Sequence, residues 1–125
     1  MNPESIREFI IALPAVEETF PFDEQTLVFK VMGKMFALTD VDEFASMNLK
    51  CEPERAVQLR EEHHAVKPGW HMNKTHWNTV EFDGTLSDKL IKELIVHSYQ
   101  LVVDGLPKKL QAELVKMEGF PAEPV

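Results

Sequence analysis

Apolar side chains recur at two spacings along this chain, and each spacing predicts a different kind of element. From Ile6 to Leu13 the apolar residues are three or four positions apart, which predicts an amphipathic helix over residues 2–13. Asn2 is the expected cap of this helix and Pro3 suits its first position. The same spacing predicts further helices over residues 53–64, 87–105 and 107–117, the second of which is capped by Ser87 and ended by Gly105.

Other segments alternate apolar and polar residues, which predicts strands. The stretch "TLVFKVMGKMFALTD" at 26–40 is expected to form a hairpin whose turn is Gly33-Lys34, of type II′. Further strands are expected over 43–51 and 75–83, and in the latter Trp77 lies on the more polar face. The order α-β-β-β-α-β-α-α therefore predicts a two-layer α+β fold, with helices packed on one face of an antiparallel sheet.

Length and composition are those of a single globular domain. The 125 residues suit one domain over 1–125, with a frayed tail over 118–125. Cys51 is the sole cysteine, so no intramolecular disulfide can form, and no apolar run approaches the roughly 20 residues that span a bilayer. The start of the chain lacks the pattern of a signal peptide. A cytoplasmic protein without membrane partners is expected.

The chain carries a formal net charge of −8, which changes the functional picture. Contacts with phosphates dominate the affinity of proteins for nucleic acids, and an acidic molecule repels phosphates. Binding to nucleic acid would therefore require a local cluster of cations.

Residues that could carry out catalysis or bind metal are scattered. The histidines His63, His64, His71 and His76, taken with Cys51, lack the spacing of a zinc site, so neither a metal nor a cofactor is expected. A cysteine that precedes a helix can have a lowered thiol pKa. Cys51, however, continues an apolar alternation, which favours a buried structural thiol. No catalytic residue is assigned.

The stretch "PGWHMNKTHWNTV" at 68–80 combines aromatic and cationic side chains. Aromatic residues interleaved with lysine can stack bases and hold phosphates. An ordinary turn in which Trp77 covers the edge of the core is the favoured alternative. With the lysines of the expected hairpin and third strand, the candidate nucleic-acid-binding residues are Lys30, Lys34, Lys50, Lys67, Lys74, His76 and Trp77.

Four stretches together resemble the MmcQ/YjbR-like family over about residues 17 to 114. They are "TLVFKVMGKMFALTD", "MNLKCEPERAVQLRE", "VKPGWHMNKTHWNTVEFDG" and "HSYQLVVDGLPKKLQAEL". The resemblance implies a small bacterial, cytoplasmic α+β protein with a fold like that of secretion chaperones. It also implies DNA binding of the double-wing type, with no enzymatic activity and no cofactor. The positions that match the family motifs are His71, Met72, Asn73, Lys74, His76, Trp77, Asn78, Ser98 and Tyr99.

Three functions remain open at this point. The first is DNA binding, as the resemblance implies, and the second is a protein-interaction or adaptor domain that binds no nucleic acid. The third is an enzyme or small-ligand protein in which His71, His76, Asn78 and Tyr99 converge on a pocket. A contiguous positive patch over the hairpin tip and residues 67–77 would favour DNA, whereas a negative surface would favour a protein partner. The sequence does not reveal a target or an oligomeric state.

Overall fold

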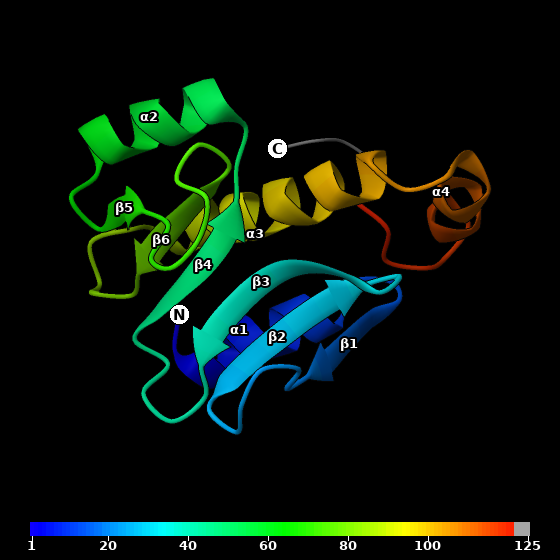
Figure 1. Ribbon diagram of the computed structural model, residues 1–125, viewed down its shortest axis with the longest axis horizontal. Coiled ribbons are helices and arrows are strands. Elements are labelled where there is room, and N and C mark those ends of the chain that lie inside the picture. Colours follow the sequence, from blue (N-terminus) through cyan, green and yellow to red (C-terminus); the bar gives the residue numbers. More distant parts are fainter. Residues whose placement is uncertain (122–125) are drawn as a thin grey trace.

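The computed structural model describes residues 1–121, which form one antiparallel sheet and four helices (Figure 1). The six strands lie in the order β1-β2-β3-β4-β6-β5. Their bounds are β1 Val16–Thr19, β2 Thr26–Val31, β3 Lys34–Asp40, β4 Ser46–Lys50, β5 Val66–Pro68 and β6 Trp77–Glu81, and the helices are α1 Pro3–Ile11, α2 Pro53–Glu62, α3 Asp88–Asp104 and α4 Lys108–Val115.

The predicted α+β class with helices on one face is confirmed, but two strands were missed. Both are at the edges of the sheet: β1 pairs with β2, and β5 pairs with β6. Glu17 and Glu18 in β1 break the apolar alternation, and β5 is only three residues long and ends in Pro68. Short, polar or proline-containing segments are typical of edge strands and give a weak signal in the sequence.

The main core lies between the sheet and helices α1 and α3. Figure 1 shows both helices behind the sheet, so that its other face is turned toward the viewer. As the alternation predicted, Leu27, Phe29 and Val31 of β2 are buried in this core. The predicted caps are also present: the side chain of Asn2 accepts a hydrogen bond from the Ser5 amide, and Ser87 accepts one from Leu90.

The turn between β2 and β3 lies one residue earlier than predicted. Val31 pairs with Lys34, so the two turn residues are Met32 and Gly33 rather than Gly33 and Lys34. Both have positive φ, 49° and 81°, as in a type I′ turn and not in the expected type II′. Lys34 is thereby the first residue of β3 and not part of the turn.

A bulge in β3 explains why two consecutive residues enter the core. Phe29 pairs with Ala37 and Lys30 with Met35, which leaves Phe36 without a partner on β2. Phe36 and Ala37 are both fully buried in the main core. The ring of Phe36 meets that of Tyr99 on α3 edge to face, with centroids 5.4 Å apart. By turning Phe36 toward Tyr99, the bulge brings β3 into contact with α3, the longest helix.

The end of the chain returns to α3. The rings of Phe120 and Tyr99 lie 6.2 Å apart, and Gln100 donates a hydrogen bond to the carbonyl oxygen of Pro121. The last four residues of the tail predicted to be frayed, 122–125, lie outside the described residues.

Candidate functional site

The face of the sheet opposite α1 and α3, here called the open face, carries its own small apolar cluster. Val28, Leu38 and Trp77 are buried there, and Met35 and Met72 pack against them. Trp77 is only 8% exposed. An open face of this kind is normally polar and wet, so its apolar cluster must be covered by something other than a helix.

The loop over residues 69–76 provides this cover. The Trp70 amide donates to Thr79 Oγ1 at 2.9 Å, Thr79 Oγ1 donates to Asn48 Oδ1 at 2.6 Å, and Asn48 Nδ2 donates to the Trp70 carbonyl oxygen at 3.0 Å. These three bonds form a closed ring that ties the loop to β4 and β6.

Gly69 allows the loop to lie this close to the sheet. A Cβ at this position would be 2.8 Å from both the Cβ and the carbonyl oxygen of Trp77. No side chain fits there, so only glycine permits the approach.

Two further residues of the loop stabilise its shape. Asn73 Oδ1 accepts hydrogen bonds from the amides of Thr75 and His76. Lys74 Nζ donates to the carbonyl oxygen of Gly69 at 3.0 Å. Asn73 and Lys74 therefore have structural roles within the loop.

The structure separates the candidate nucleic-acid-binding residues into two groups. Trp77 is buried, which corrects its assignment as a base-stacking residue, because a stacking side chain must present its ring to the ligand. Lys67 is paired with Glu81 at 2.8 Å. Lys74 holds the loop. The side chains of Lys30, Lys34, Lys50 and His76 make no hydrogen bond or ion pair within residues 1–121, and the backbone of His76 is bonded to that of Cys51 next to Lys50.

The remaining family-motif residues connect elements of the fold. Ser98 accepts a hydrogen bond from the Lys50 amide at 2.8 Å and donates one to the Phe36 carbonyl oxygen. The Tyr99 hydroxyl donates to the carbonyl oxygen of Pro14. Asn78 Nδ2 donates to the carbonyl oxygen of Ala56, and its buried Oδ1 has no hydrogen-bond partner among residues 1–121. The family motifs at Ser98, Tyr99 and Asn78 are therefore accounted for by contacts that hold the fold together.

The pocket expected from His71, His76, Asn78 and Tyr99 is not formed. His71 lines a groove on the open face, whereas Asn78 faces the opposite side of the sheet and Tyr99 is fully buried in the main core. Within residues 1–121, no three His, Cys, Asp or Glu side chains are placed to hold a metal ion. None of the described helices is long and apolar enough to cross a bilayer.

Cys51 is a buried core residue, in agreement with the favoured interpretation. Burial raises the pKa of its thiol to about 11, which is the opposite of what a nucleophilic cysteine requires. Next to it, the Glu52 amide donates to His97 Nε2 at 3.1 Å. Burial is also the main cause of the lowered pKa of His97, so the imidazole is held neutral as an acceptor.

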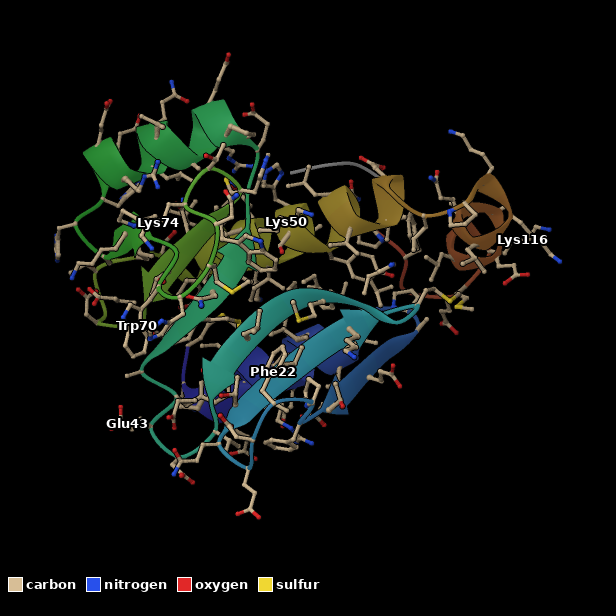
Figure 2. The ribbon with its side chains drawn as sticks, in the orientation of Figure 1. Phe22, Glu43, Lys50, Trp70, Lys74 and Lys116 are labelled. Atoms are coloured by element: carbon tan, nitrogen blue, oxygen red, sulfur yellow. The ribbon has the colours of Figure 1, made fainter. Side chains whose placement is uncertain are left out.

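A groove lies on the open face between two exposed aromatic side chains. Phe22, in the loop between β1 and β2, is 63% exposed, and Trp70, in the loop over 69–76, is 70% exposed. Figure 2 shows Trp70 at the left of this face and Phe22 over β2 and β3. The groove has a volume of about 390 Å³ and is lined by Phe22, Thr26, Leu38, Thr39, Asp40, Asn48, Trp70, His71 and Met72. Reasoning from the sequence missed this Phe22–Trp70 groove, although Trp70 lies within the stretch that it singled out.

His71 has an unusual backbone conformation at the edge of this groove. Its φ is 60°, and its ring lies 4.4 Å from the ring of Trp70. A left-handed residue other than glycine is maintained only where its surroundings enforce it. Here the bonds of the Trp70 backbone to Asn48 and Thr79 fix the preceding residue, and so they hold the backbone from which the exposed indole projects.

Charges are separated along the open face. At the groove end, Asp23 accepts hydrogen bonds from the amides of Gln25 and Thr26, which hold the pKa of its carboxyl below the usual range. Asp40 accepts bonds from the amides of Asp42 and Glu43, and the Val41 amide donates to the Gln25 carbonyl oxygen, so the two acidic turns adjoin. The unpaired Lys30 and Lys50 lie on this face away from the two acidic turns, opposite Met35 and Trp77 in the strand register; in Figure 2 Glu43 and Lys50 mark the two ends.

Comparison with known proteins assigns the fold and its motifs to a family. The family model YjbR matches residues 11–101. The chain belongs to the YjbR family. It is 35% identical over 118 residues to the uncharacterised protein YjbR of Escherichia coli strain K12, covering 94% of this chain and 100% of that one. It is 38% identical over 109 residues to the uncharacterised protein YbdF of Escherichia coli O157:H7, covering 86% and 89%.

Solved structures of similar chains share this architecture. The crystal structure of protein DR2400 of Deinococcus radiodurans, described as a DUF419 domain, is 40% identical with a TM-score of 0.83, over 98% of this chain and 99% of that chain. A crystal structure of a protein from Pseudomonas syringae is 28% identical with a TM-score of 0.69, over 81% and 98%. The resemblance seen in the sequence is confirmed. The names of these relatives state no activity, so DNA binding stays a prediction.

Proposed function

We propose that this protein is a non-enzymatic interaction domain that binds a protein partner through the Phe22–Trp70 groove. One observation supports this most: two aromatic side chains, 63% and 70% exposed, line a groove on a sheet face that none of the helices within residues 1–121 covers. Aromatic residues are enriched among the side chains that dominate binding energy in protein interfaces.

A second groove with exposed apolar side chains lies beside α1. Phe20 and Val41, which are 48% and 38% exposed, line it together with Pro3 and Arg7 of that helix. Apolar side chains grouped on a protein surface are a usual mark of an interaction site. The loop that carries Trp70 is held rigidly by its bonds to Asn48 and Thr79, so little ordering entropy is lost on binding.

A co-purification experiment with matched variants tests this proposal. The tagged full chain, its Phe22→Ala/Trp70→Ala variant and a Val115→Ala/Met117→Ala control are each incubated with nuclease-treated bacterial lysate. Val115 and Met117 are also exposed apolar residues, 61% and 41%, but belong to the α4 region. We expect one protein to be retained by the wild type and the control and lost from the groove variant. Equal retention by all three, or no retained protein, would contradict the proposal.

DNA binding is a second candidate, favoured by a different observation at the other end of the open face. Lys30 of β2 and Lys50 of β4 pair with Met35 and Trp77 on the open face, whereas Lys34, at the start of the intervening β3, pairs with the core residue Val31. The ammonium groups of these three lysines make no ion pair within residues 1–121. The family resemblance adds support. Glu17 lies directly opposite Lys30 in the register of β1 and β2, and its negative charge reduces the positive potential of these lysines.

Salt dependence separates this candidate from the first. Each phosphate contact with duplex DNA contributes a slope of about −0.9 to log K against log salt, so three lysines would contribute about −3. The triple variant Lys30→Gln/Lys34→Gln/Lys50→Gln should bind a labelled duplex more weakly and with a flatter slope, measured by fluorescence anisotropy. The control replaces Lys108, Lys109 and Lys116 of the α4 region by Gln. An absence of binding by the wild type at low salt would exclude this candidate.

A further inference from the structure

The Phe22–Trp70 groove has a charge character that narrows the chemistry of its occupant. Among its nine lining residues, Asp40 is the one carboxylate, and there is no lysine or arginine. The adjoining turns add Asp23, Asp42 and Glu43, all exposed. An anionic ligand would be repelled here, whereas a cationic group would be attracted.

Only one of the two oxygens of the Asp40 carboxylate is hydrogen-bonded within residues 1–121. Its Oδ1 accepts hydrogen bonds from the amides of Asp42 at 2.9 Å and Glu43 at 3.1 Å. Its Oδ2 makes no hydrogen bond within residues 1–121 and is available to a donor from outside the chain. Asp40 is exposed at the rim of the groove, so an incoming donor needs no rearrangement to reach it.

The aromatic sides of the groove favour the same kind of group. Faces of Trp and Phe attract cations through the quadrupole of the ring, and guanidinium groups are the commonest partners. Arginine is also planar and weakly hydrated, so it stacks on an aromatic face while it donates to a carboxylate. Leu38 and Met72 between the two aromatic residues offer apolar contacts to the neighbours of such a residue.

We propose that the Phe22–Trp70 groove binds an extended protein segment through an arginine flanked by apolar side chains. The guanidinium lies against the ring of Trp70 or Phe22 and donates to Asp40 Oδ2, and the flanking side chains contact Leu38 and Met72. This inference rests on the proposed function and adds the chemical class of the partner.

A titration with short blocked peptides tests the assignment. Acetyl-Leu-Arg-Leu-amide is added to the ¹⁵N-labelled full chain and followed by NMR, in parallel with peptides that carry glutamate or the uncharged arginine isostere citrulline. We expect the arginine peptide to shift the amide signals of Phe22, Asn48, Trp70 and Met72, and the other two peptides to bind more weakly or not at all. Equal binding of the citrulline or glutamate peptide would overturn the proposal.

Two variants locate the interaction. Asp40→Asn keeps an Oδ1 that accepts the two backbone bonds, so the turn is preserved while the charge is removed. We expect it to weaken the arginine peptide about fivefold, the upper range for an exposed ion pair. Trp70→Ala should weaken it by a similar factor of about five through the lost cation–π contact. Asp104→Asn, an exposed carboxylate at the end of α3, is the matched control and should have no effect. An unchanged affinity of the Asp40→Asn variant would overturn the role of the charge.

The peptide and co-purification experiments distinguish failure of this inference from failure of the proposed function. If a partner is lost from the Phe22→Ala/Trp70→Ala variant but kept by Asp40→Asn, and the arginine peptide does not bind, the cation assignment is wrong and the interaction domain stands. If the groove variant retains every partner that the wild type retains, the proposed function itself is wrong.

Discussion

Thr79 donates a hydrogen bond from Oγ1 to Asn48 Oδ1 at 2.6 Å, which joins the side chains of two paired strands on the open face. The same hydroxyl oxygen accepts the Trp70 amide. One threonine therefore links the sheet to the loop over 69–76 and holds the backbone that carries the exposed indole of Trp70. The shape of the Phe22–Trp70 groove depends on this link.

Thr79→Val should loosen the loop without disturbing the rest of the sheet. Valine keeps the shape and β-branching of threonine but removes the hydroxyl, and a lost hydrogen bond of this kind costs about 1 kcal/mol in the free energy of unfolding. We expect faster hydrogen exchange at the Trp70 amide, measured by NMR, and a small decrease of the urea midpoint. Thr75→Val, in the same exposed loop, is the control. Unchanged exchange at Trp70 would show that the ring of bonds does not hold the loop.

Gly69→Ala should destabilise the protein more than Thr79→Val does. The added Cβ would lie 2.8 Å from atoms of Trp77, including a backbone oxygen, so the loop or β6 has to shift. Overpacking of this kind costs about 1–3 kcal/mol in the free energy of unfolding. Chemical denaturation measures the loss, and the near-ultraviolet circular dichroism of the tryptophans should change with it. Gly84→Ala serves for comparison: its Cβ would meet no atom within 4 Å, although its φ of 88° adds backbone strain.

Tyr99→Phe should destabilise the protein because it removes a buried hydrogen bond to the carbonyl oxygen of Pro14. The phenol donates to the Pro14 carbonyl oxygen at 2.8 Å in a buried environment, and its removal leaves that oxygen without its side-chain donor. Leaving a buried acceptor unsatisfied costs about 1–3 kcal/mol. Urea denaturation should show a lower midpoint with the same slope. A stability equal to that of the wild type would mean that water replaces the donor.

Burial raises the pKa of Tyr99 to about 12, so its ultraviolet titration should be shifted to high pH in the wild type.

Stability should fall as the pH drops below about 6.5, because of His97. Burial, reinforced by Arg55 and opposed by Glu52, lowers the pKa of this imidazole from its ordinary value of 6.5. Below that value the unfolded chain binds a proton at His97 that the folded chain resists, so protonation favours unfolding. The contribution is fully present above the ordinary pKa and is lost as the pH falls.

Denaturation curves at pH 7.5 and 5.0 measure this effect, with His97→Gln as the comparison. Glutamine can accept the Glu52 amide but does not titrate, so its stability should change less between the two pH values. The carboxyls of Asp23, Glu52 and Asp83, whose pKa values are lowered by hydrogen bonds, titrate below this interval. An equal decrease in the wild type and the variant would assign the pH dependence to other groups.

The sequence determined those features of the protein that depend on local spacing. Alternation placed Leu27, Phe29 and Val31 on the buried face of β2, and the three-to-four spacing found α1 and α3 with their caps at Asn2 and Ser87. These predictions held because burial of one face imposes a period on neighbouring residues. The same logic placed Trp77 on the open face, but it could not say whether the indole was exposed.

What only the tertiary structure decided is which distant side chains meet on the surface. Phe22 and Trp70 belong to loops far apart in the chain. They line one groove because the loop before β2 and the loop before β6 both flank the open face over β3 and β4, and the Asn48–Thr79–Trp70 bonds hold the second loop there. The tertiary structure also decided which lysines are paired. Lys67 contacts Glu81 and Lys74 contacts the carbonyl oxygen of Gly69, and the spacing of residues along the chain predicts neither contact. Periodicity is a property of neighbours along the chain, whereas a binding surface is made by strand order and loop geometry, which depend on the whole fold.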